Sequence, residues 1–272
     1  MMKTKNKKQI IAIGGGGYSV WSHNLPINEY ILRQSGKKNP RICFLGTASG
    51  DSTKNIQMFY EGFGRFKCRV SHLSLYKPHT QEIEKFILSK DIIYVGGGNT
   101  LNLLVLWHGW KLDKMLRKAW EKGIVLAGAS AGSICWFEEA VTDSIPGRLR
   151  PLKCLGFLPG SNCPHYDSEK KRRPAFHRFL AEKKIKGGYA VDDCVALHFI
   201  GSSLENVIAS KPNAHAYVVG LKNGRVVENK MVPTLLPGVK KMTFKSPGRK
   251  SEPITSLSSV GYSRLSISGR SG

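Results

Sequence analysis

The chain lacks any hydrophobic run of the roughly 18 residues that a membrane-spanning helix needs. Its 272 residues are 41% hydrophobic, and its mass of 30.1 kDa allows a sizeable buried core. Only 22% of the residues are charged, which is too few for a disordered chain with this many core-forming side chains. We therefore expect a soluble globular protein with no membrane partner.

Acidic residues are scarce, with 19 Asp and Glu against 42 Lys and Arg and a formal charge of +23. Such an excess raises the question of a nucleic-acid or anionic partner. Nearly half of it lies near the termini, in residues 1–8 and 240–272. No zinc-finger, RNP or leucine-zipper pattern accompanies the charge, so we expect a solvated basic surface rather than a specific nucleic-acid site.

The cysteines and histidines lack the spacings of metal sites, such as C-x-x-C or H-E-x-x-H, so we expect no metal. Six cysteines are spread along the chain, several in apolar segments, as is typical of reduced core thiols. Lysines precede the apolar run 10–13, but that run stops at four glycines and is too short for a signal peptide. These features predict a cytoplasmic protein.

Short β-branched runs bounded by glycine or proline alternate with longer helical patterns, which predicts an α/β fold with a parallel sheet covered on both faces. The expected strands are Gln9–Ile13, Arg41–Leu45, Cys68–Leu73, Ile92–Val95 and Ile124–Ala127, and the expected helices are Thr53–Phe66, Thr80–Leu88, Thr100–Leu106 and Lys111–Lys122. Beyond residue 185, short runs separated by turn signals predict antiparallel strands that finish the sheet: Tyr189–Val191, Val195–Phe199, Asn206–Ala209, Ala216–Leu221 and Arg225–Glu228, with Asn223-Gly224 as a hairpin turn.

The composition divides the chain into three parts. We expect residues 1–8 to be a basic N-terminal extension and residues 9–239 to form one folded domain. Residues 240–272 are rich in Ser, Gly, Lys and Arg with little periodicity, which predicts a flexible tail without a chemical role.

Two glycine-rich loops follow predicted strands. Gly14–Gly17 does not fit the G-x-G-x-x-G register of dinucleotide sites and has no P-loop lysine, so we interpret it as a tight turn where backbone approaches closely. In the second loop, Gly96–Asn99, backbone N–H groups could bind an anion or an oxyanion, and Thr100 could cap the following helix.

The segment Gly123–Phe137 contains G-x-S-x-G between an apolar strand and a helical pattern. This is the context of a nucleophile elbow, in which small residues at 128 and 132 allow the sharp turn that exposes Ser130. A nucleophilic serine needs a base, and His165 lies in an irregular segment just downstream. The base needs an orienting acid, for which spacing leaves four aspartates open: Asp143, Asp167, Asp192 and Asp193.

Three segments, Tyr94–Leu101, Gly128–Gly132 and Cys163–Tyr166, resemble the motifs of peptidase E, the aspartyl dipeptidase family of serine peptidases that also includes cyanophycinases. The resemblance covers roughly residues 9–238, with the motifs in family order. It implies a class I glutamine-amidotransferase-like (flavodoxin-like) fold, a three-layer sandwich with a mostly parallel central sheet. It also implies a serine peptidase that needs no cofactor and hydrolyses dipeptides with an N-terminal aspartate.

The resemblance also assigns roles to residues. Ser130 would be the nucleophile, His165 the base, and the N–H groups of Gly98 and Ala131 the oxyanion hole, with Asn99 lining the substrate site. Asp143 fits the acid best, and Asp192 is the alternative. Selectivity for aspartate implies a guanidinium at the substrate carboxylate, for which the candidates are Arg172 and Arg173.

Other functions remain open from sequence. An α/β-hydrolase esterase also uses G-x-S-x-G, although only 35 positions separate Ser130 from His165. A cyanophycinase-like peptidase of different specificity, or a non-catalytic anion-binding or nucleic-acid-binding protein on the same fold, would also suit these features. Cys135 is a weaker nucleophile candidate because it lies five residues past the elbow. A homodimer is compatible with the sequence.

Overall fold

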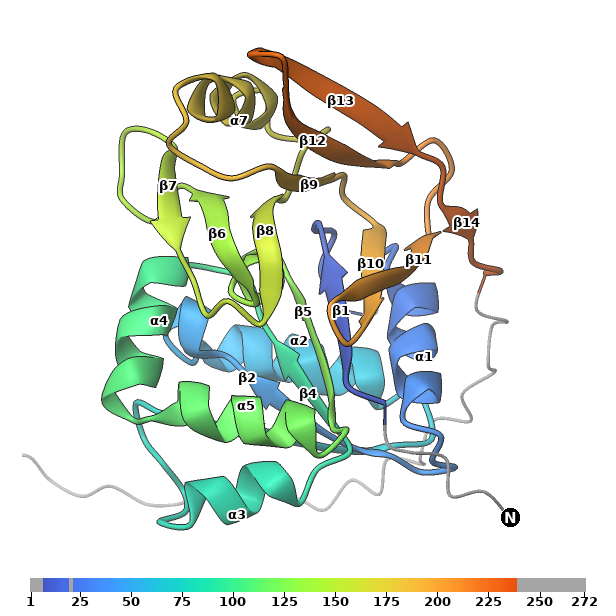
Figure 1. The fold of residues 1–272 in the computed structure, drawn as a ribbon. Coiled ribbons are helices and arrows are strands. Elements are labelled where there is room, and N and C mark those ends of the chain that lie inside the picture. The colour runs from blue at the N-terminus through green and yellow to red at the C-terminus, as the bar shows by residue number, and fades with distance from the viewer. Residues whose placement is uncertain (1–6, 20–21, 239–272) are drawn as a thin grey trace, which may run out of the picture. The chain divides into compact units, whose positions relative to one another are not determined.

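The computed structural model describes residues 7–19 and 22–238. Eight strands form a mostly parallel sheet in the order β14-β11-β10-β1-β5-β4-β2-β3, shown in Figure 1. β10 is antiparallel to both of its neighbours, β1 and β11, whereas β1, β5, β4, β2 and β3 run parallel. The strands are β1 (Gln9–Ile13), β2 (Arg41–Leu45), β3 (Arg69–Leu73), β4 (Ile92–Val95), β5 (Val125–Ala129), β10 (Val195–Ile200), β11 (Ser203–Ala209) and β14 (Thr234–Leu235).

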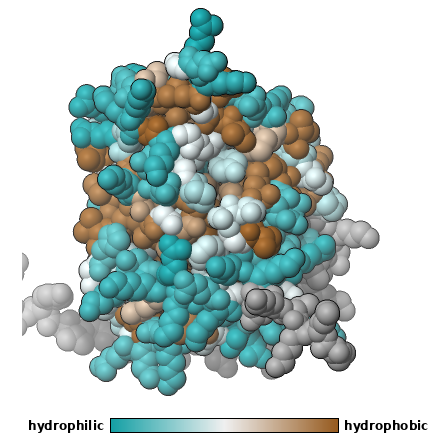
Figure 2. Space-filling view, in the orientation of Figure 1, coloured by the Kyte–Doolittle hydropathy of each residue, from teal (hydrophilic) through white to brown (hydrophobic). Residues whose placement is uncertain are grey.

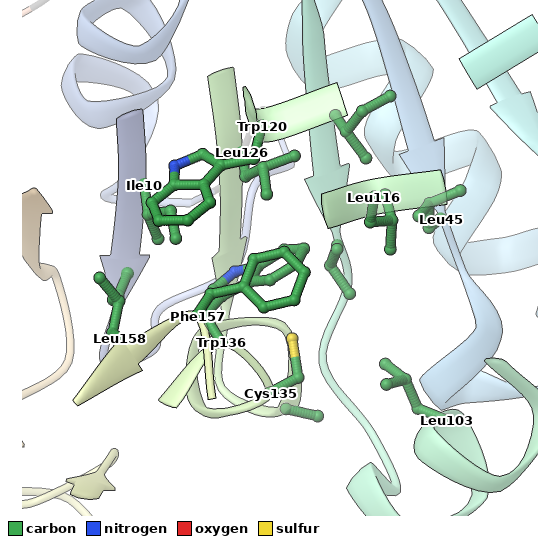
Figure 3. Packing of buried hydrophobic residues seen from close by; sticks show 14 of the residues in the cluster. Ile10, Leu45, Leu103, Leu116, Trp120, Leu126, Cys135, Trp136, Phe157 and Leu158 are labelled. Atoms are coloured by element: carbon green, nitrogen blue, oxygen red, sulfur yellow. The ribbon is translucent and has the colours of Figure 1, made fainter. Parts of the chain in front are cut away.

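Helices cover both faces of this sheet because its strands are apolar on both sides. In β1, Ile10 and Ala12 pack with α3 (Ile83–Leu88), α4 (Thr100–Gly109) and α5 (Leu112–Glu121). Ile11 and Ile13 point the other way, toward α1 (Leu25–Gln34) and α2 (Thr53–Phe63). Figure 3 shows the first of these cores, where aromatic rings from α5 and from the segments after β5 meet. The three-layer sandwich predicted from sequence is therefore present.

A second sheet of six strands has the order β13-β12-β9-β8-β6-β7. Its strands are β6 (Phe137–Thr142), β7 (Arg150–Lys153), β8 (Leu158–Cys163), β9 (Gly188–Val191), β12 (Ala216–Lys222) and β13 (Arg225–Met231). Helix α7 (Arg172–Ala181) packs on it through a small core that includes Phe176 and Leu180. The expectation that all the late strands finish the first sheet was wrong. β8 and β12 occupy the two edges of β9, so only β10, β11 and β14 join the first sheet.

Between residues 7–19 and 22–238, no helix is long and apolar enough to cross a membrane. On the face seen in Figure 2, hydrophilic residues cover the lower part, over α3, and apolar residues are interspersed among polar ones above it. The predicted tail, residues 240–272, and the first six residues of the basic extension lie outside the described residues.

Candidate active site

Ser130 lies in a sharp turn between β5 and the short helix α6 (Ala131–Ile134). Its backbone has φ 56° and ψ −115°, a strained conformation for a residue with a side chain. The Ser130 N–H donates to the carbonyl of Ile13 at 3.1 Å, which fixes the turn to β1. The serine hydroxyl therefore stands at the carboxyl edge of the parallel strands, as expected for a nucleophile elbow.

The two glycines that flank Ser130 are required by close backbone contacts. A Cβ on Gly128 would lie 2.7 Å from the carbonyl oxygen of Val95, and a Cβ on Gly132 would lie 2.6 Å from the Val95 carbonyl carbon. Real Cβ atoms do not approach backbone this closely, so β4, β5 and α6 can meet only if both positions are glycine. The prediction that small residues allow the turn thus has a steric basis.

His165 follows β8 and brings its imidazole from the second sheet to the serine. Its Nε2 lies 2.8 Å from Ser130 Oγ, and its Nδ1 lies 2.7 Å from Oδ1 of Asp193. An ionised carboxylate can only accept, so Nδ1 carries the proton and Nε2 is free to accept the serine hydroxyl. His165 also has a positive φ, 53°, and its carbonyl accepts from the N–H of Glu169, which turns the chain sharply after the strand.

Asp193 lies in the turn between β9 and β10, and its own N–H donates to the Asp167 carboxylate at 2.9 Å. Burial alone would raise the pKa of Asp193, but its hydrogen bond to His165 and the charges of His165 and Lys211 bring that pKa below its usual value. Asp193 is therefore ionised at neutral pH and suited to orient the imidazole.

The side chain of Asp192, the neighbouring aspartate, faces the backbone of His215 and not His165. Its Oδ2 accepts from the N–H of His215 at 2.8 Å. Burial and the nearby carboxylates of Asp167 and Asp193 raise the pKa of Asp192 to about 6. The alternative acid predicted from sequence is thus adjacent to the histidine's partner without being that partner.

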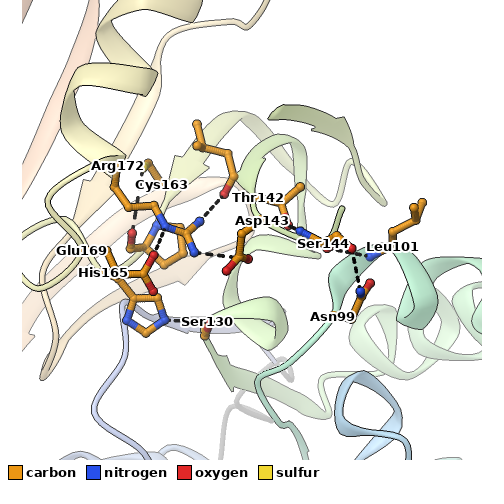
Figure 4. A network of polar contacts seen from close by, with 12 residues as sticks. Asn99, Leu101, Ser130, Thr142, Asp143, Ser144, Cys163, His165, Glu169 and Arg172 are labelled. Atoms are coloured by element: carbon orange, nitrogen blue, oxygen red, sulfur yellow. Dashed lines mark hydrogen bonds and ion pairs between the residues drawn. The ribbon is translucent and has the colours of Figure 1, made fainter. Parts of the chain in front are cut away.

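Asp143 was the preferred acid, and the structure does not bring it to His165. Its side chain is 65% exposed and lies 3.4 Å from Nη2 of Arg172. Figure 4 shows it between that guanidinium and the chain that leads to Ser144. β6 and β9 are both parallel neighbours of β8, so Asp143 and Asp193 follow strands on opposite sides of the strand that precedes His165. Nδ1 of the imidazole faces the β9 side, and Asp143 pairs with Arg172 instead.

The second glycine loop passes beside the nucleophile. A Cβ on Gly97 would lie 3.2 Å from the Cβ of Ser130. In the described part of the chain, no acceptor takes a hydrogen bond from the N–H groups of Gly98 or Ala131. Asn99 uses its side chain within the protein: Oδ1 accepts from the Asn102 N–H at 2.9 Å and caps α4, and Nδ2 donates to the carbonyl of Ser144 at 2.8 Å.

The two candidate arginines are both held by carboxylates. Arg172 is only 3% exposed and donates to Glu169 Oε2 at 2.7 Å and to the carbonyl of Val141 at 2.8 Å, with Asp143 at its third nitrogen. Arg173 is exposed, pairs with Glu228 and lies over the rings of Tyr166 and Tyr217. Burying the Arg172 charge is tolerated because all three of its nitrogens face oxygen atoms.

Comparison with known proteins decides the family. The model of Peptidase family S51 matches residues 10–207. The chain belongs to this family. It is 55% identical over 221 residues to the uncharacterized peptidase YgaJ of Bacillus subtilis, which covers 81% of this chain and 96% of that protein. It is 23% identical over 189 residues to peptidase E of Pasteurella multocida, covering 66% of this chain and 79% of that protein.

The S51 assignment agrees with the fold. A crystal structure of a peptidase from an acI-B1 Actinobacterium superposes with a TM-score of 0.63 at 16% identity, covering 84% of this chain and 96% of that one. At this identity the likeness concerns the fold alone. The family resemblance, the fold class and the assignment as a serine peptidase that were inferred from sequence are thus confirmed.

In this S51 peptidase, Cys135 is placed for packing. Its thiol is buried in the first core, and burial raises its pKa well above the usual value. Its Sγ lies 3.5 Å from the carbonyl oxygen of Gly132. A thiol that stays protonated is a poor nucleophile, which argues against the cysteine alternative. Among the described residues, no group of three or more His, Cys, Asp or Glu side chains could hold a metal ion.

Proposed function

We propose that this S51 peptidase hydrolyses short peptides through an acyl-enzyme, with Ser130 as nucleophile, His165 as base and Asp193 as orienting acid. The observation that carries the proposal is the continuous line of contacts from Ser130 Oγ through the imidazole to the Asp193 carboxylate, at 2.8 and 2.7 Å. Nucleophile, base and orienting group within hydrogen-bond reach are the signature of an activated serine.

In the first half of the reaction, Ser130 Oγ attacks the carbonyl carbon of the peptide and its proton passes to His165 Nε2. The tetrahedral intermediate then expels the amine as the C–N bond breaks, and His165 donates that proton to the leaving nitrogen. In the second half, water attacks the acyl ester while His165 takes its proton. The acid product leaves, and His165 returns the proton to Ser130.

The N–H groups of Gly98 and Ala131 are proposed as the oxyanion hole. Support comes from the position of the second glycine loop against Ser130 and from the lack of a described acceptor for either N–H. Donors aimed at the developing negative charge typically contribute about 3 kcal/mol each to transition-state stabilisation. Because both donors belong to the backbone, no side chain is needed to stabilise the oxyanion.

The proposed substrate is a dipeptide with an N-terminal aspartate, and this specificity depends on Arg172 or Arg173. Arg173 is the more accessible, because Arg172 is buried among three acceptors. For Arg173 to bind a substrate carboxylate in two hydrogen bonds, it must loosen its pair with Glu228. We propose that the reaction takes place in the cytoplasm, in keeping with six free cysteines, four of them buried.

The test measures hydrolysis of aspartyl, glutamyl and leucyl dipeptides by the wild type, by Ser130→Ala and by Ser133→Ala. Loss of the nucleophile should lower kcat at least about 1,000-fold. Ser133, on the same short helix, accepts from Asn162 at 3.0 Å and serves as the matched control, which should retain activity. Turnover that survives in Ser130→Ala would refute the proposed mechanism.

The same panel decides the specificity. Hydrolysis of the aspartyl substrate alone, reduced by Arg173→Met, supports the aspartyl dipeptidase. Equal hydrolysis of all three substrates, still dependent on Ser130, would keep the serine peptidase and reject the aspartyl preference. Faster turnover of simple esters than of any peptide, again dependent on Ser130, would favour the esterase.

A further inference from the structure

Asn24 immediately precedes α1 and is fully buried, yet its side chain does not cap that helix. Asparagine at this position ordinarily accepts a hydrogen bond from the first turn. Here Nδ2 donates instead to the carbonyl of Gly15 at 2.7 Å, and Oδ1 accepts from the Ser210 hydroxyl at 3.1 Å. The Gly15 carbonyl can only accept, so it fixes which end of the amide faces the first glycine loop.

Gly15 is the residue of that loop in contact with the catalytic pair. A Cβ at this position would lie 2.5 Å from both Cε1 and Nδ1 of His165 and would also collide with the Asp193 carboxylate. The loop backbone thus forms the wall against which the imidazole and the carboxylate pack. A shift of this wall would change the direction of the imidazole toward Ser130.

The carbonyl of Gly15 has a second donor, the N–H of Cys194, at 3.2 Å. Cys194 directly follows Asp193 and has a positive φ of 65°, so this bond holds the tight turn that presents the acid. One carbonyl oxygen therefore ties together Asn24, the glycine loop and the turn of the acid. Glycine backbone has little conformational restraint of its own, and Gly16 and Gly17 both have positive φ, so the loop has to be anchored from outside. The Ser22 hydroxyl contacts the carbonyls of Gly16 and Gly17 at the exposed side, and Asn24 holds the Gly15 carbonyl at the buried side.

We propose that Asn24 is a positioning residue for the reaction, which acts through the Gly15 carbonyl to hold the His165–Asp193 pair in line with Ser130. The inference rests on the proposed function of these three residues. It assigns a role in the reaction to a side chain that does not touch the substrate and that lies on the first sheet's side of the site.

Asn28, in the first turn of α1, provides a matched control. It too is fully buried, and its Nδ2 donates to a loop carbonyl, that of Tyr18, at 3.0 Å. Tyr18 packs with Phe44, Phe59 and Tyr94 in the second core. Substituting either asparagine removes a buried amide at the start of α1, but only Asn24 holds the carbonyl next to the catalytic pair.

The experiment compares Asn24→Ala, Asn24→Asp and Asn28→Ala with the wild type and Ser130→Ala, using the peptide substrate that the wild type hydrolyses fastest. Asn24→Asp keeps the size of the side chain and the acceptor for Ser210 but removes the donor, which guards against a folding failure of the alanine variant. We measure kcat and KM, the rate at which a fluorophosphonate modifies Ser130, and the low-field proton resonance of the His165–Asp193 hydrogen bond.

Both Asn24 variants should lower kcat and the modification rate about 10- to 100-fold with little change in KM, because a small misplacement of a catalytic group has effects of this size. Their low-field resonance should shift or broaden. Asn28→Ala should lose thermal stability with kcat and resonance unchanged. If Asn24 and Asn28 variants lose stability alike while kcat and the resonance stay at wild-type values, the inference is overturned. If Ser130→Ala retains turnover, the proposed function fails, and the resonance still decides whether Asn24 holds the pair.

Discussion

The two glycine-rich loops have similar composition and follow strands of the same sheet, yet they differ in which backbone groups are held within the protein. Gly14–Gly17 is anchored through a carbonyl and packs against the His165–Asp193 pair. Gly96–Gly98 lies beside Ser130, and the N–H of Gly98 has no described acceptor. A loop without side chains can therefore support a charged pair by close packing or stabilise an anion by its amides, and only its surroundings tell which.

The two sides of the site also differ in their acids. On the side of the first loop, Asp193 contacts His165 directly. On the side of the second loop, the Asn99 side chain donates to the carbonyl of Ser144. Asp143, the residue before Ser144, faces Arg172. We therefore place the proposed charge relay on the first side and the proposed oxyanion contacts on the second.

The largest expected effect comes from replacing each of the two candidate acids, Asp193 and Asp143, with asparagine. Asp193→Asn should lower kcat about 1,000- to 10,000-fold, because an amide that donates to Nδ1 forces the wrong imidazole tautomer. The factor by which Asp143→Asn lowers kcat should be at least about ten times smaller, because the partner of Asp143 is Arg172 and not His165. Steady-state kinetics on both variants, with circular dichroism to check folding, makes the comparison. A greater loss in Asp143→Asn would move the acid to the other side of the site.

A smaller effect is expected from adding one methyl group to the first loop. Gly15→Ala should lower kcat roughly 100-fold, because the new Cβ displaces the imidazole of His165 or the Asp193 carboxylate. Gly109→Ala, at the end of α4, is the control, since a Cβ there meets nothing within 4 Å. Wild-type kcat in Gly15→Ala would show that the loop does not support the pair.

The smallest effect concerns stability. The folded protein keeps the Asp192 proton up to about pH 6, whereas the unfolded chain releases it near the ordinary pKa of 3.8. Stability should therefore fall as the pH rises between these values, because the folded state binds more protons there. At pH 7, the free energy of unfolding of Asp192→Asn should be about 1–2 kcal/mol larger than that of the wild type. This difference should disappear below about pH 4. Urea unfolding at both pH values measures it, and an equal difference at both would contradict the assignment.

Much of the first sheet could be predicted because its strands are apolar and end at glycines. The observed bounds of β1, β2 and β4 are those expected from sequence. The serine turn was also predictable, since G-x-S-x-G stands between an apolar strand and a helical pattern. Helix α1 was missed even though Pro26 at its start is a known initiation signal.

The second sheet and the acid could not be predicted in the same way. β8 contains Pro159 and Gly160, residue types that are depleted in strands, so its pattern does not resemble a strand. Without β8, the register that pairs Cys163 with Ala190 is unknown. That register brings the residues after both strands to one edge, but the parallel pairing of β6 with β8 does the same for Asp143. The direction of the His165 imidazole, which spacing in the sequence does not show, distinguishes Asp193.

The three residues of the proposed catalytic triad follow strands of both sheets. Ser130 follows β5 of the first sheet, whereas His165 and Asp193 follow β8 and β9 of the second. The rate of hydrolysis should therefore depend on how the two sheets pack against each other. If their contact loosens, the nucleophile separates from the base although each sheet keeps its own hydrogen bonds. On gentle heating, the enzyme should lose activity at a lower temperature than its secondary structure. On cooling, it should regain activity as fast as the contact between the sheets forms again.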